Sequence, residues 1–232
     1  MKFTRIFTDF FRLFYPNICQ LCHRDLAKSE SVICTSCLYH IPRTHYWLEK
    51  ENPVAKIFWG RAYIENACSF FFFSKGSKYR KLLHQLKYNG RQDIGIMLGQ
   101  EFGRELKQVE EYSKIDYIVP VPLHAKRFKQ RGYNQAECIA RGLAVSLMKP
   151  VITNNLLRIE YTETQTLRSR AERMKNVQNA FKVNNPSLLV GKHILLVDDV
   201  ITTGATLEVC SSTLLAVEEV KVSVVTLAYT SL

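Results

Sequence analysis

The stretch Ile194–Thr206 reads ILLVDDVITTGAT, four apolar residues followed by two aspartates and a glycine turn rich in threonine. The apolar run predicts a buried strand of a parallel sheet. After the turn, apolar residues recur at helical spacing, at Leu207, Cys210, Leu214 and Val217. The sequence therefore predicts a strand, a turn and a helix that begins at the turn, which is the repeating unit of an α/β fold.

The turn after the aspartates has the composition of a phosphate-binding site. The range Thr202–Thr206 offers three hydroxyls, and Gly204 lets the backbone come close to a ligand. A helix N-terminus adds free amides that bind a phosphate dianion. Asp198 and Asp199 repel phosphate but accept hydrogen bonds from sugar hydroxyls, so the stretch indicates a ribose 5-phosphate ligand. The alternative is a turn whose aspartates only cap the helix. Because no Lys follows Gly204, the turn is not a nucleotide P-loop.

Length and composition set the class of protein. The chain has 232 residues, enough for one α/β domain of ordinary size and a small appendage, and its hydrophobic content of 47% argues against a disordered chain. A net charge of +11 and a pI near 9.4 favour polyanionic partners, which are phosphorylated small molecules, nucleic acid or anionic membrane surfaces. A generally basic, soluble surface explains the charge equally well.

Residues 1–16 form an amphipathic N-terminal segment. The apolar side chains on one face of its predicted helix are Phe3, Ile6, Phe7, Phe10, Phe11 and Phe14. Asp9 and Arg12 interrupt the apolar run and there is no small-residue cleavage site, so the segment is not a signal peptide. No stretch approaches the roughly 20 apolar residues of a membrane span. We expect a cytoplasmic protein, and we favour packing of this helix on its own domain over docking to the inner face of the membrane.

Residues 17–52 contain two Cys-x-x-Cys pairs separated by eleven residues. Each pair directs two thiolates at one ion, and two pairs complete a tetrahedral site with no open position, which is typical of structural zinc. The metal would hold together a segment too short to bury a core of its own. A disulfide pair or a redox motif is the alternative. His23 or His40 could replace a thiolate, although we expect both to be surface histidines. The predicted zinc ligands are Cys19, Cys22, Cys34 and Cys37.

The larger domain is predicted to span residues 60–232, after a linker around Pro53. Residues 62–64 and 70–73 are predicted strands, and the second is apolar enough to require burial. Ser77–Tyr88 is a predicted helix with one leucine-rich side and one basic side.

The basic side of the helix at 77–88 is a candidate nucleic-acid interface. Aromatic rings that could stack on bases are interleaved with its cations, at Tyr79, His84 and Tyr88. A solvated charged face is the alternative interpretation. The predicted nucleic-acid contacts are Lys78, Arg80, Lys81, Lys87 and Arg91.

A second strand, loop and helix is predicted at residues 115–147. The strand Ile115–Pro122 ends in two prolines, a cationic loop follows as far as Gln135, and apolar residues at helical spacing predict a helix over 136–147. Two such units predict a parallel α/β sheet with both loops at its ligand-binding edge. Arginine forks match phosphate oxygens, so this loop is a candidate anion site, with a merely solvated basic loop as the alternative.

Residues 165–176 are polar and rich in cations. Such a segment could close over a ligand and shield the reacting carbon from water, while its cations neutralise a developing anion. An exposed helix without a function explains the composition nearly as well. The candidate lid cations are Arg168, Arg170, Arg173 and Lys175.

Residues 198–206 closely resemble the 5-phosphoribosyl 1-diphosphate (PRPP) motif of type I phosphoribosyltransferases. The resemblance implies that Asp198 and Asp199, the candidate catalytic residues, contact the ribose hydroxyls of PRPP bound with Mg²⁺. It also implies that the loop after the earlier strand holds pyrophosphate. The implied contacts of the 5-phosphate are Thr202, Thr203, Gly204, Ala205 and Thr206. The implied pyrophosphate contacts are Arg127, Arg131 and Gly132.

A series of ordered motifs is similar to that of the ComF family and runs from about Cys19 to the C-terminus. The motifs are the double Cys-x-x-Cys, LKYNGR at 86–91, VPVPL at 119–123, RGYNQ at 131–135, Gln165 with Arg173, Asn176, Ala180 and Phe181, and the stretch at 198–206. Tyr133 stands where the family more usually has phenylalanine. The resemblance implies a type I phosphoribosyltransferase-like parallel α/β sheet flanked by helices, with a small N-terminal zinc ribbon.

The resemblance to the ComF family also implies a role in natural competence, the uptake of single-stranded DNA. We expect a PRPP-binding, phosphoribosyltransferase-like protein that acts in DNA uptake and binds single-stranded DNA through its basic surfaces. Its partners would be PRPP, single-stranded DNA and competence-machinery proteins such as a DNA helicase. The alternative is an active, Mg²⁺-dependent phosphoribosyltransferase with a nucleobase or nucleotide-related acceptor, for which the sequence identifies no base pocket.

Overall fold

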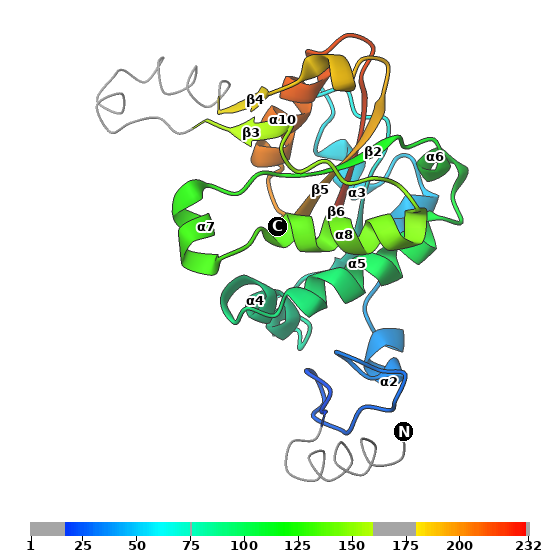
Figure 1. The fold of residues 1–232 in the computed structure, drawn as a ribbon. Coiled ribbons are helices and arrows are strands. Elements are labelled where there is room, and N and C mark those ends of the chain that lie inside the picture. Colours follow the sequence, from blue (N-terminus) through cyan, green and yellow to red (C-terminus); the bar gives the residue numbers. More distant parts are fainter. Residues whose placement is uncertain (1–16, 75, 160–179, 231–232) are drawn as a thin grey trace, which may run out of the picture.

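A four-stranded parallel sheet forms the centre of the molecule (Figure 1). The computed structural model describes residues 17–74, 76–159 and 180–230. The strands lie in the order β1-β6-β5-β2, so the strand that precedes the predicted phosphate turn is central. Their bounds are Ala67–Phe72 (β1), Tyr117–Pro120 (β2), His193–Ile201 (β5) and Lys221–Tyr229 (β6). The predicted parallel α/β sheet is confirmed.

Strand β5 is buried on both faces, which explains its continuous apolar sequence. Its side chains alternate between the two faces, as in any strand. Leu195 and Val197 belong to the core on one face, and Ile194 and Leu196 belong to the core on the other. The strand therefore holds Asp198 and Asp199, which lie near its end, at the carboxyl edge of the sheet.

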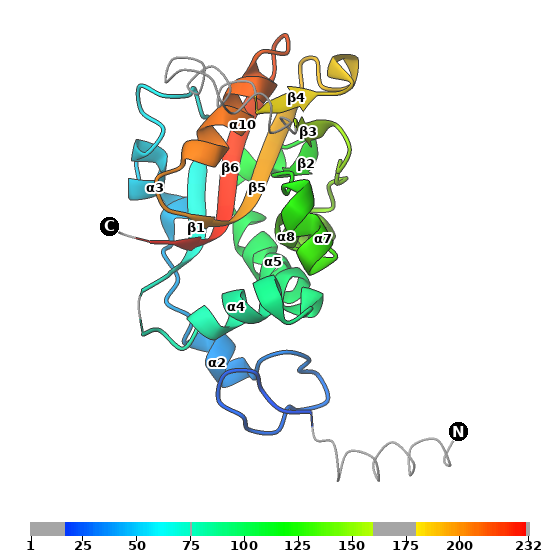
Figure 2. The same ribbon diagram turned by 90° about the vertical axis from the view of Figure 1, so that its left-hand side faces the viewer.

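Helices cover both faces of the sheet (Figure 2). The helices α5 (Gln92–Leu106) and α8 (Gln135–Leu147) lie on one face, and α10 (Ala205–Leu215) and α3 (Pro53–Lys56) lie on the other. The remaining described helices are α2 (Thr35–Tyr39), η1 (Tyr46–Leu48), α4 (Arg80–Tyr88), α6 (Glu110–Ser113), α7 (Ala125–Arg131) and η3 (Pro186–Leu188).

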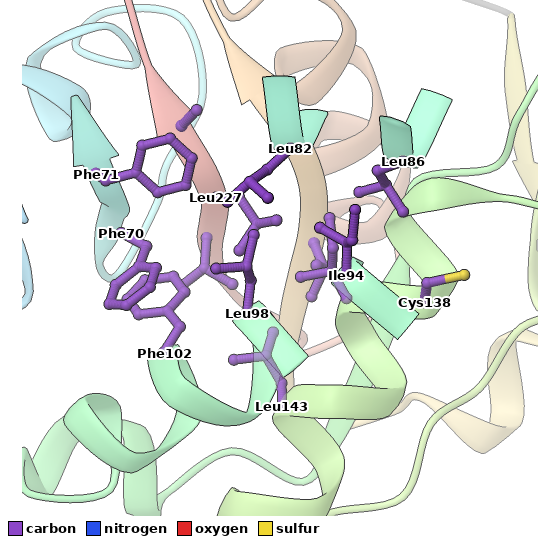
Figure 3. Close-up of a cluster of buried hydrophobic side chains, with 14 of the residues drawn as sticks. Phe70, Phe71, Leu82, Leu86, Ile94, Leu98, Phe102, Cys138, Leu143 and Leu227 are labelled. Carbon is purple, nitrogen blue, oxygen red and sulfur yellow. The ribbon is translucent and has the colours of Figure 1, made fainter. Parts of the chain in front are cut away.

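A large apolar cluster joins β1 and β6 to α4, α5 and α8 (Figure 3). The rings of Phe70 and Phe102 stack with their centroids 5.1 Å apart. Leu82 and Leu86 of α4 are fully buried in the same cluster and Leu83 nearly so, which confirms the predicted apolar side of this helix. Because burial of a leucine contributes about 2 kcal/mol, these side chains hold α4 firmly against the rest of the core.

The four-cysteine segment, residues 17–52, contributes side chains to this apolar cluster. Val32, Ile33 and Trp47 are buried in it together with Phe70, and the rings of Trp47 and Phe102 lie 5.6 Å apart. In both views the segment that contains α2 lies next to α4, at the end of the molecule away from strand β4 (Phe181–Val183) (Figures 1 and 2). The division of the chain at residues 17–52 and 60–232 stays a prediction.

The strands β3 (Leu156–Arg158) and β4 (Phe181–Val183) pair antiparallel in a separate small sheet. The candidate lid at 165–176 and the amphipathic segment at 1–16 lie outside the described residues. No helix in the described part of the chain is both long and apolar enough to cross a membrane.

Two local predictions are wrong. Residues 62–64 are not a strand, because the amides of Arg61 and Ala62 donate to the Phe58 carbonyl at 2.9 and 3.0 Å and turn the chain back. The cationic loop after β2 contains the helix α7, because the His124 side chain accepts a hydrogen bond from Lys126 N at its start. The strand predicted at 70–73 is confirmed, although β1 begins earlier and ends one residue sooner.

Candidate functional site

A cleft of about 210 Å³ lies at the carboxyl ends of β5 and β2, the edge at which open parallel sheets bind their ligands. Separate stretches of the chain contribute to it, namely α4, α7 and the end of β5 with the turn that follows. The charged and turn residues that line it are Lys87, Arg127, Arg131, Asp198, Asp199 and Thr206. The structure thus brings residues predicted to contact ribose, 5-phosphate and pyrophosphate into one place.

The threonine turn joins β5 to α10 as predicted. Gly204 is the N-cap of α10 with φ of +73°, a conformation that side-chain-bearing residues rarely adopt. A Cβ at this position would lie 2.5 Å from Ile57 Cγ2, so the glycine is also required by packing. Residues 200–207 and Asp198 line a smaller hollow of about 80 Å³ above the first amides of the helix. These amides have no acceptor within the helix and can bind an anion.

Arg61 holds the threonine turn in place through two contacts. The sequence analysis did not identify this role. Its Nη1 donates to the Thr203 carbonyl at 2.9 Å, and its Nη2 forms an ion pair with Glu208 of α10. The turn is therefore tied to the segment after α3, far away in sequence. A single arginine next to a linker carries no sequence signal that could have identified this role.

Asp198 occupies an environment that disfavours its charge. Burial raises the pKa of its carboxyl to about 7, and the neighbouring carboxylate of Asp199 adds to the rise. The amide of Asp199, which donates to Asp198 Oδ1 at 2.8 Å, and the Lys87 ammonium act in the opposite direction. A carboxyl with such a pKa in a cleft is typical of a functional site.

Asp199 forms an ion pair across the cleft. Its Oδ2 lies 2.9 Å from the Nζ of Lys87, which is in the last turn of α4. Lys87 is also a predicted nucleic-acid contact, and that role stays a prediction. The structure places its side chain at the cleft, because α4 packs its leucines on the core and turns Lys87 toward the end of β5.

Arg127 and Arg131 of α7 line the same cleft as the aspartates. Arg131 Nη1 donates to Gln135 Oε1 at 2.6 Å, and its guanidinium lies 5.2 Å from the ring centroid of Tyr88. Among the described residues, Arg131 Nε has no hydrogen-bond partner although it is buried. Gly132, with φ of +78°, ends α7 and is not among the residues that line the cleft.

The basic helix α4 is less free than its sequence indicates. Tyr79 is buried and donates through its hydroxyl to the Cys37 carbonyl at 3.0 Å, so its ring cannot stack on a base. Lys81 Nζ lies 3.0 Å from His23 Nε2, and Arg91 pairs with Asp93. The predicted contact residues that remain exposed are Lys78, Arg80, Lys81, His84 and Tyr88.

The four cysteines of residues 17–52 converge on one point. Their sulfur atoms all lie within 4.8 Å of one another, and those of Cys22 and Cys34 are 3.6 Å apart. Tetrahedral coordination with metal–sulfur bonds of about 2.3 Å requires sulfur atoms about 3.8 Å apart, so the cluster could bind a structural metal such as zinc. The Cys34 amide donates to Cys19 Sγ at 3.3 Å, a contact that supports a thiolate. His23 and His40 are exposed, as predicted.

Comparisons with known proteins identify relatives of this chain by sequence. Residues 129–231 match the family model described as phosphoribosyl transferase domain. The chain is 30% identical to the DNA utilization protein YhgH of Salmonella typhimurium over 201 residues, which cover 82% of this chain and 87% of that protein. It is 26% identical to the competence protein ComFC of Bacillus subtilis over 199 residues, which cover 86% of this chain and 72% of that protein.

One solved structure that is similar to part of this chain is glutamine phosphoribosylpyrophosphate (PRPP) amidotransferase from B. subtilis. It is 21% identical, the match covers 60% of this chain and 30% of that chain, and the TM-score is 0.41.

Proposed function

Because the chain belongs to the ComF/YhgH family and carries a phosphoribosyl transferase domain, we propose that its cleft binds PRPP together with Mg²⁺ as part of DNA uptake or utilization. One observation carries this proposal. The acidic pair, two arginines and Thr206 line one cleft at the carboxyl edge of the sheet, and the rest of the threonine turn lines a smaller hollow that shares Asp198 and Thr206 with the cleft. This set of groups matches the three parts of PRPP, which are a phosphate, a ribose with vicinal hydroxyls and a pyrophosphate.

Each part of PRPP has a complementary set of groups. The first amides of α10 and the hydroxyls of Thr202–Thr206 would hold the 5-phosphate. Asp198 and Asp199 would accept hydrogen bonds from the ribose hydroxyls. Arg127 and Arg131 would pair with pyrophosphate. The buried Nε of Arg131, which has no hydrogen-bond partner among the described residues, supports an anionic ligand here. Gly132 would contribute by ending α7 so that both arginines face the cleft.

A divalent cation fits the same cleft. Mg²⁺ takes oxygen ligands, and two carboxylates lie beside the place proposed for the ribose hydroxyls and pyrophosphate. When bound, the ion would neutralise part of the pyrophosphate charge. Arg168, Arg170 and Arg173 of the candidate lid would add cations over the ligand.

The test is calorimetric titration of PRPP into the parent protein and into the double variant Asp198→Asn with Asp199→Asn, each with Mg²⁺. The substitution keeps the side-chain volume but removes charge and half of the acceptor capacity. We expect at least about tenfold weaker binding, which is roughly 1.4 kcal/mol. Equal affinity in a folded double variant would refute the assignment.

A second candidate function is transfer of the ribosyl group to an acceptor, and an apolar groove next to the cleft favours it. The groove has a volume of about 670 Å³ and shares Pro122, Leu123 and Arg158 with the cleft. Phe128 and Leu157 complete an apolar lining that suits a flat ring such as a nucleobase. The test is release of pyrophosphate from PRPP in the presence of each common nucleobase. Release that depends on one of them identifies the acceptor, and no release above the acceptor-free rate leaves binding as the function.

We also propose that the cysteine cluster holds one structural Zn²⁺. Four thiols within reach of one ion suit the reducing cytoplasm, where we place the protein, better than a disulfide. Elemental analysis of the purified protein should find about one zinc per chain.

Single-stranded DNA is the proposed macromolecular ligand, supported by the net charge of +11 and by the exposed cations of α4 with Tyr88 and His84 among them. A DNA helicase of the competence machinery is a proposed protein partner. Fluorescence anisotropy with labelled oligonucleotides should give micromolar-range affinity that falls steeply with salt. Charge reversal at Lys78 and Arg80 should weaken binding by about fivefold. Reversal of the control residue Lys221, which lies at the amino end of β6, should have a smaller effect. Equal effects of the two changes would move the binding surface elsewhere.

A further inference from the structure

Lys87 reaches the acidic pair from a helix that lies outside the sheet. Its ammonium is 2.9 Å from Asp199 Oδ2, and the two side chains are only 25% and 14% exposed. Both line the cleft. The Coulomb attraction between two charges with so little solvent contact is stronger than on an open surface, because it is less screened.

The position of Lys87 is fixed from both sides of α4. On one side, Leu82 and Leu86 are fully buried in the core, and the Tyr133 hydroxyl donates to the Leu86 carbonyl. On the other, Gln85 Nε2 donates to Gln20 Oε1 of the four-cysteine segment at 3.1 Å, and the buried hydroxyl of Tyr79 donates to the Cys37 carbonyl at 3.0 Å. The backbone of Lys87 is therefore held in place, while its flexible side chain can move.

We propose that Lys87 is an exchangeable counter-ion of the cleft. It pairs with Asp199 when the cleft is empty and moves to the pyrophosphate of PRPP when the ribose hydroxyls take its place on Asp199. The inference rests on the proposed PRPP function and adds to it a residue from outside the strand and turn that carry the motif.

The charges in the cleft give the reason for this exchange. The Lys87 ammonium occupies acceptor capacity of the Asp199 oxygen that it contacts, so a ribose hydroxyl that donates to this oxygen competes with the ammonium for it. The displaced ammonium would then be a partly buried charge without a partner, which is unfavourable. Pyrophosphate is the closest new source of negative charge, because Arg131 and Lys87 line the same cleft. The ammonium has three donors on a flexible stem and can follow it.

The exchange predicts opposite effects of one substitution on the two halves of PRPP. Lys87→Met removes a competitor for Asp199 and should strengthen binding of ribose 5-phosphate. It also removes a partner of the pyrophosphate and should weaken binding of inorganic pyrophosphate and of PRPP. A residue that only maintains the shape of the cleft would shift all of these affinities in the same direction.

The experiment is calorimetry with ribose 5-phosphate, inorganic pyrophosphate and PRPP, using the parent protein, Lys87→Met, Lys87→Arg and Lys107→Met. Lys107→Met removes the same charge at an exposed residue after α5 that does not line the cleft. We expect Lys87→Met to bind ribose 5-phosphate about threefold more tightly and pyrophosphate about threefold more weakly, as befits a partly buried ion pair. Lys87→Arg should restore pyrophosphate binding, and Lys107→Met should match the parent. Where Lys87→Met does not fold, Lys87→Gln takes its place.

The outcomes separate this inference from the function on which it rests. Absence of PRPP binding to the parent protein overturns the proposed function and this inference with it. PRPP binding to the parent, combined with changes of the same sign or no change for ribose 5-phosphate and pyrophosphate in the Lys87 variant, overturns the role of Lys87 alone.

Discussion

The raised pKa of Asp198 predicts how the stability of the protein depends on pH. In the folded protein this pKa is about 7 instead of 3.8, because the carboxyl is buried and lies beside Asp199. Protons are therefore bound more tightly in the folded state than in the unfolded one. The contribution of this group to stability is fully present below about pH 4 and is lost as the pH rises through 7.

Asp198→Asn isolates this effect, because asparagine has nearly the same side-chain shape as aspartate but cannot ionise. A rise in pKa of this size corresponds to at most about 4 kcal/mol, and the partial contact of the cleft with solvent reduces it. We compare the free energy of unfolding of the variant with that of the parent at each pH. From pH 4 to pH 8 this difference should shift by about 1–2 kcal/mol in favour of the variant. The difference between the two proteins should grow between about pH 4 and pH 7 and then level off.

The assay is urea-induced unfolding of both proteins at intervals from pH 4 to pH 8, without ligand and at constant ionic strength. Asp25→Asn, at an exposed residue of the four-cysteine segment, controls for the loss of one negative charge from a chain with a net charge of +11. A difference between variant and parent that does not change with pH, or that is largest at low pH, would contradict a raised pKa of Asp198.

Three further predictions concern the parts that hold the site together. Gly204→Val should lower the free energy of unfolding, measured with urea, by at least about 2 kcal/mol, because the position has a positive φ and a Cβ there would contact Ile57. An unchanged free energy of unfolding would contradict this packing. Arg61→Ala should weaken PRPP binding about threefold in calorimetry by releasing the Thr203 carbonyl and Glu208, and unaltered affinity would show that the turn needs no brace. Cys22→Ser should lose bound zinc in elemental analysis and melt at a lower temperature than the parent, whereas full zinc content would rule out a four-thiolate site.

The parts of the fold that could be predicted from sequence are those in which one local pattern determines the outcome. A short continuous apolar run such as 194–197 that leads into a turn favours a strand buried on both faces, and the glycine at 204 indicates where the following helix begins. The spacing of the four cysteines predicts their convergence, because two Cys-x-x-Cys turns can direct all four sulfur atoms at one point.

The features that the sequence analysis missed depend on what packs against what. Helical spacing separates the leucines of α4 from its cations, but it does not show that Lys87 faces Asp199 or that Tyr79 is covered by the four-cysteine segment. The helix α7 has no buried side chain, so no apolar period marks it among its cations. Arg61 braces a turn that lies more than a hundred residues away, a contact that only the folded chain creates.

A structure of the protein crystallised with PRPP and Mg²⁺ would place the ligand without ambiguity. We predict the 5-phosphate within about 3 Å of the amides at the start of α10, the ribose hydroxyls at Asp198 and Asp199, and the pyrophosphate facing Arg127 and Arg131. PRPP bound away from the cleft, or seated there with its phosphate turned from residues 202–206, would contradict the proposed function.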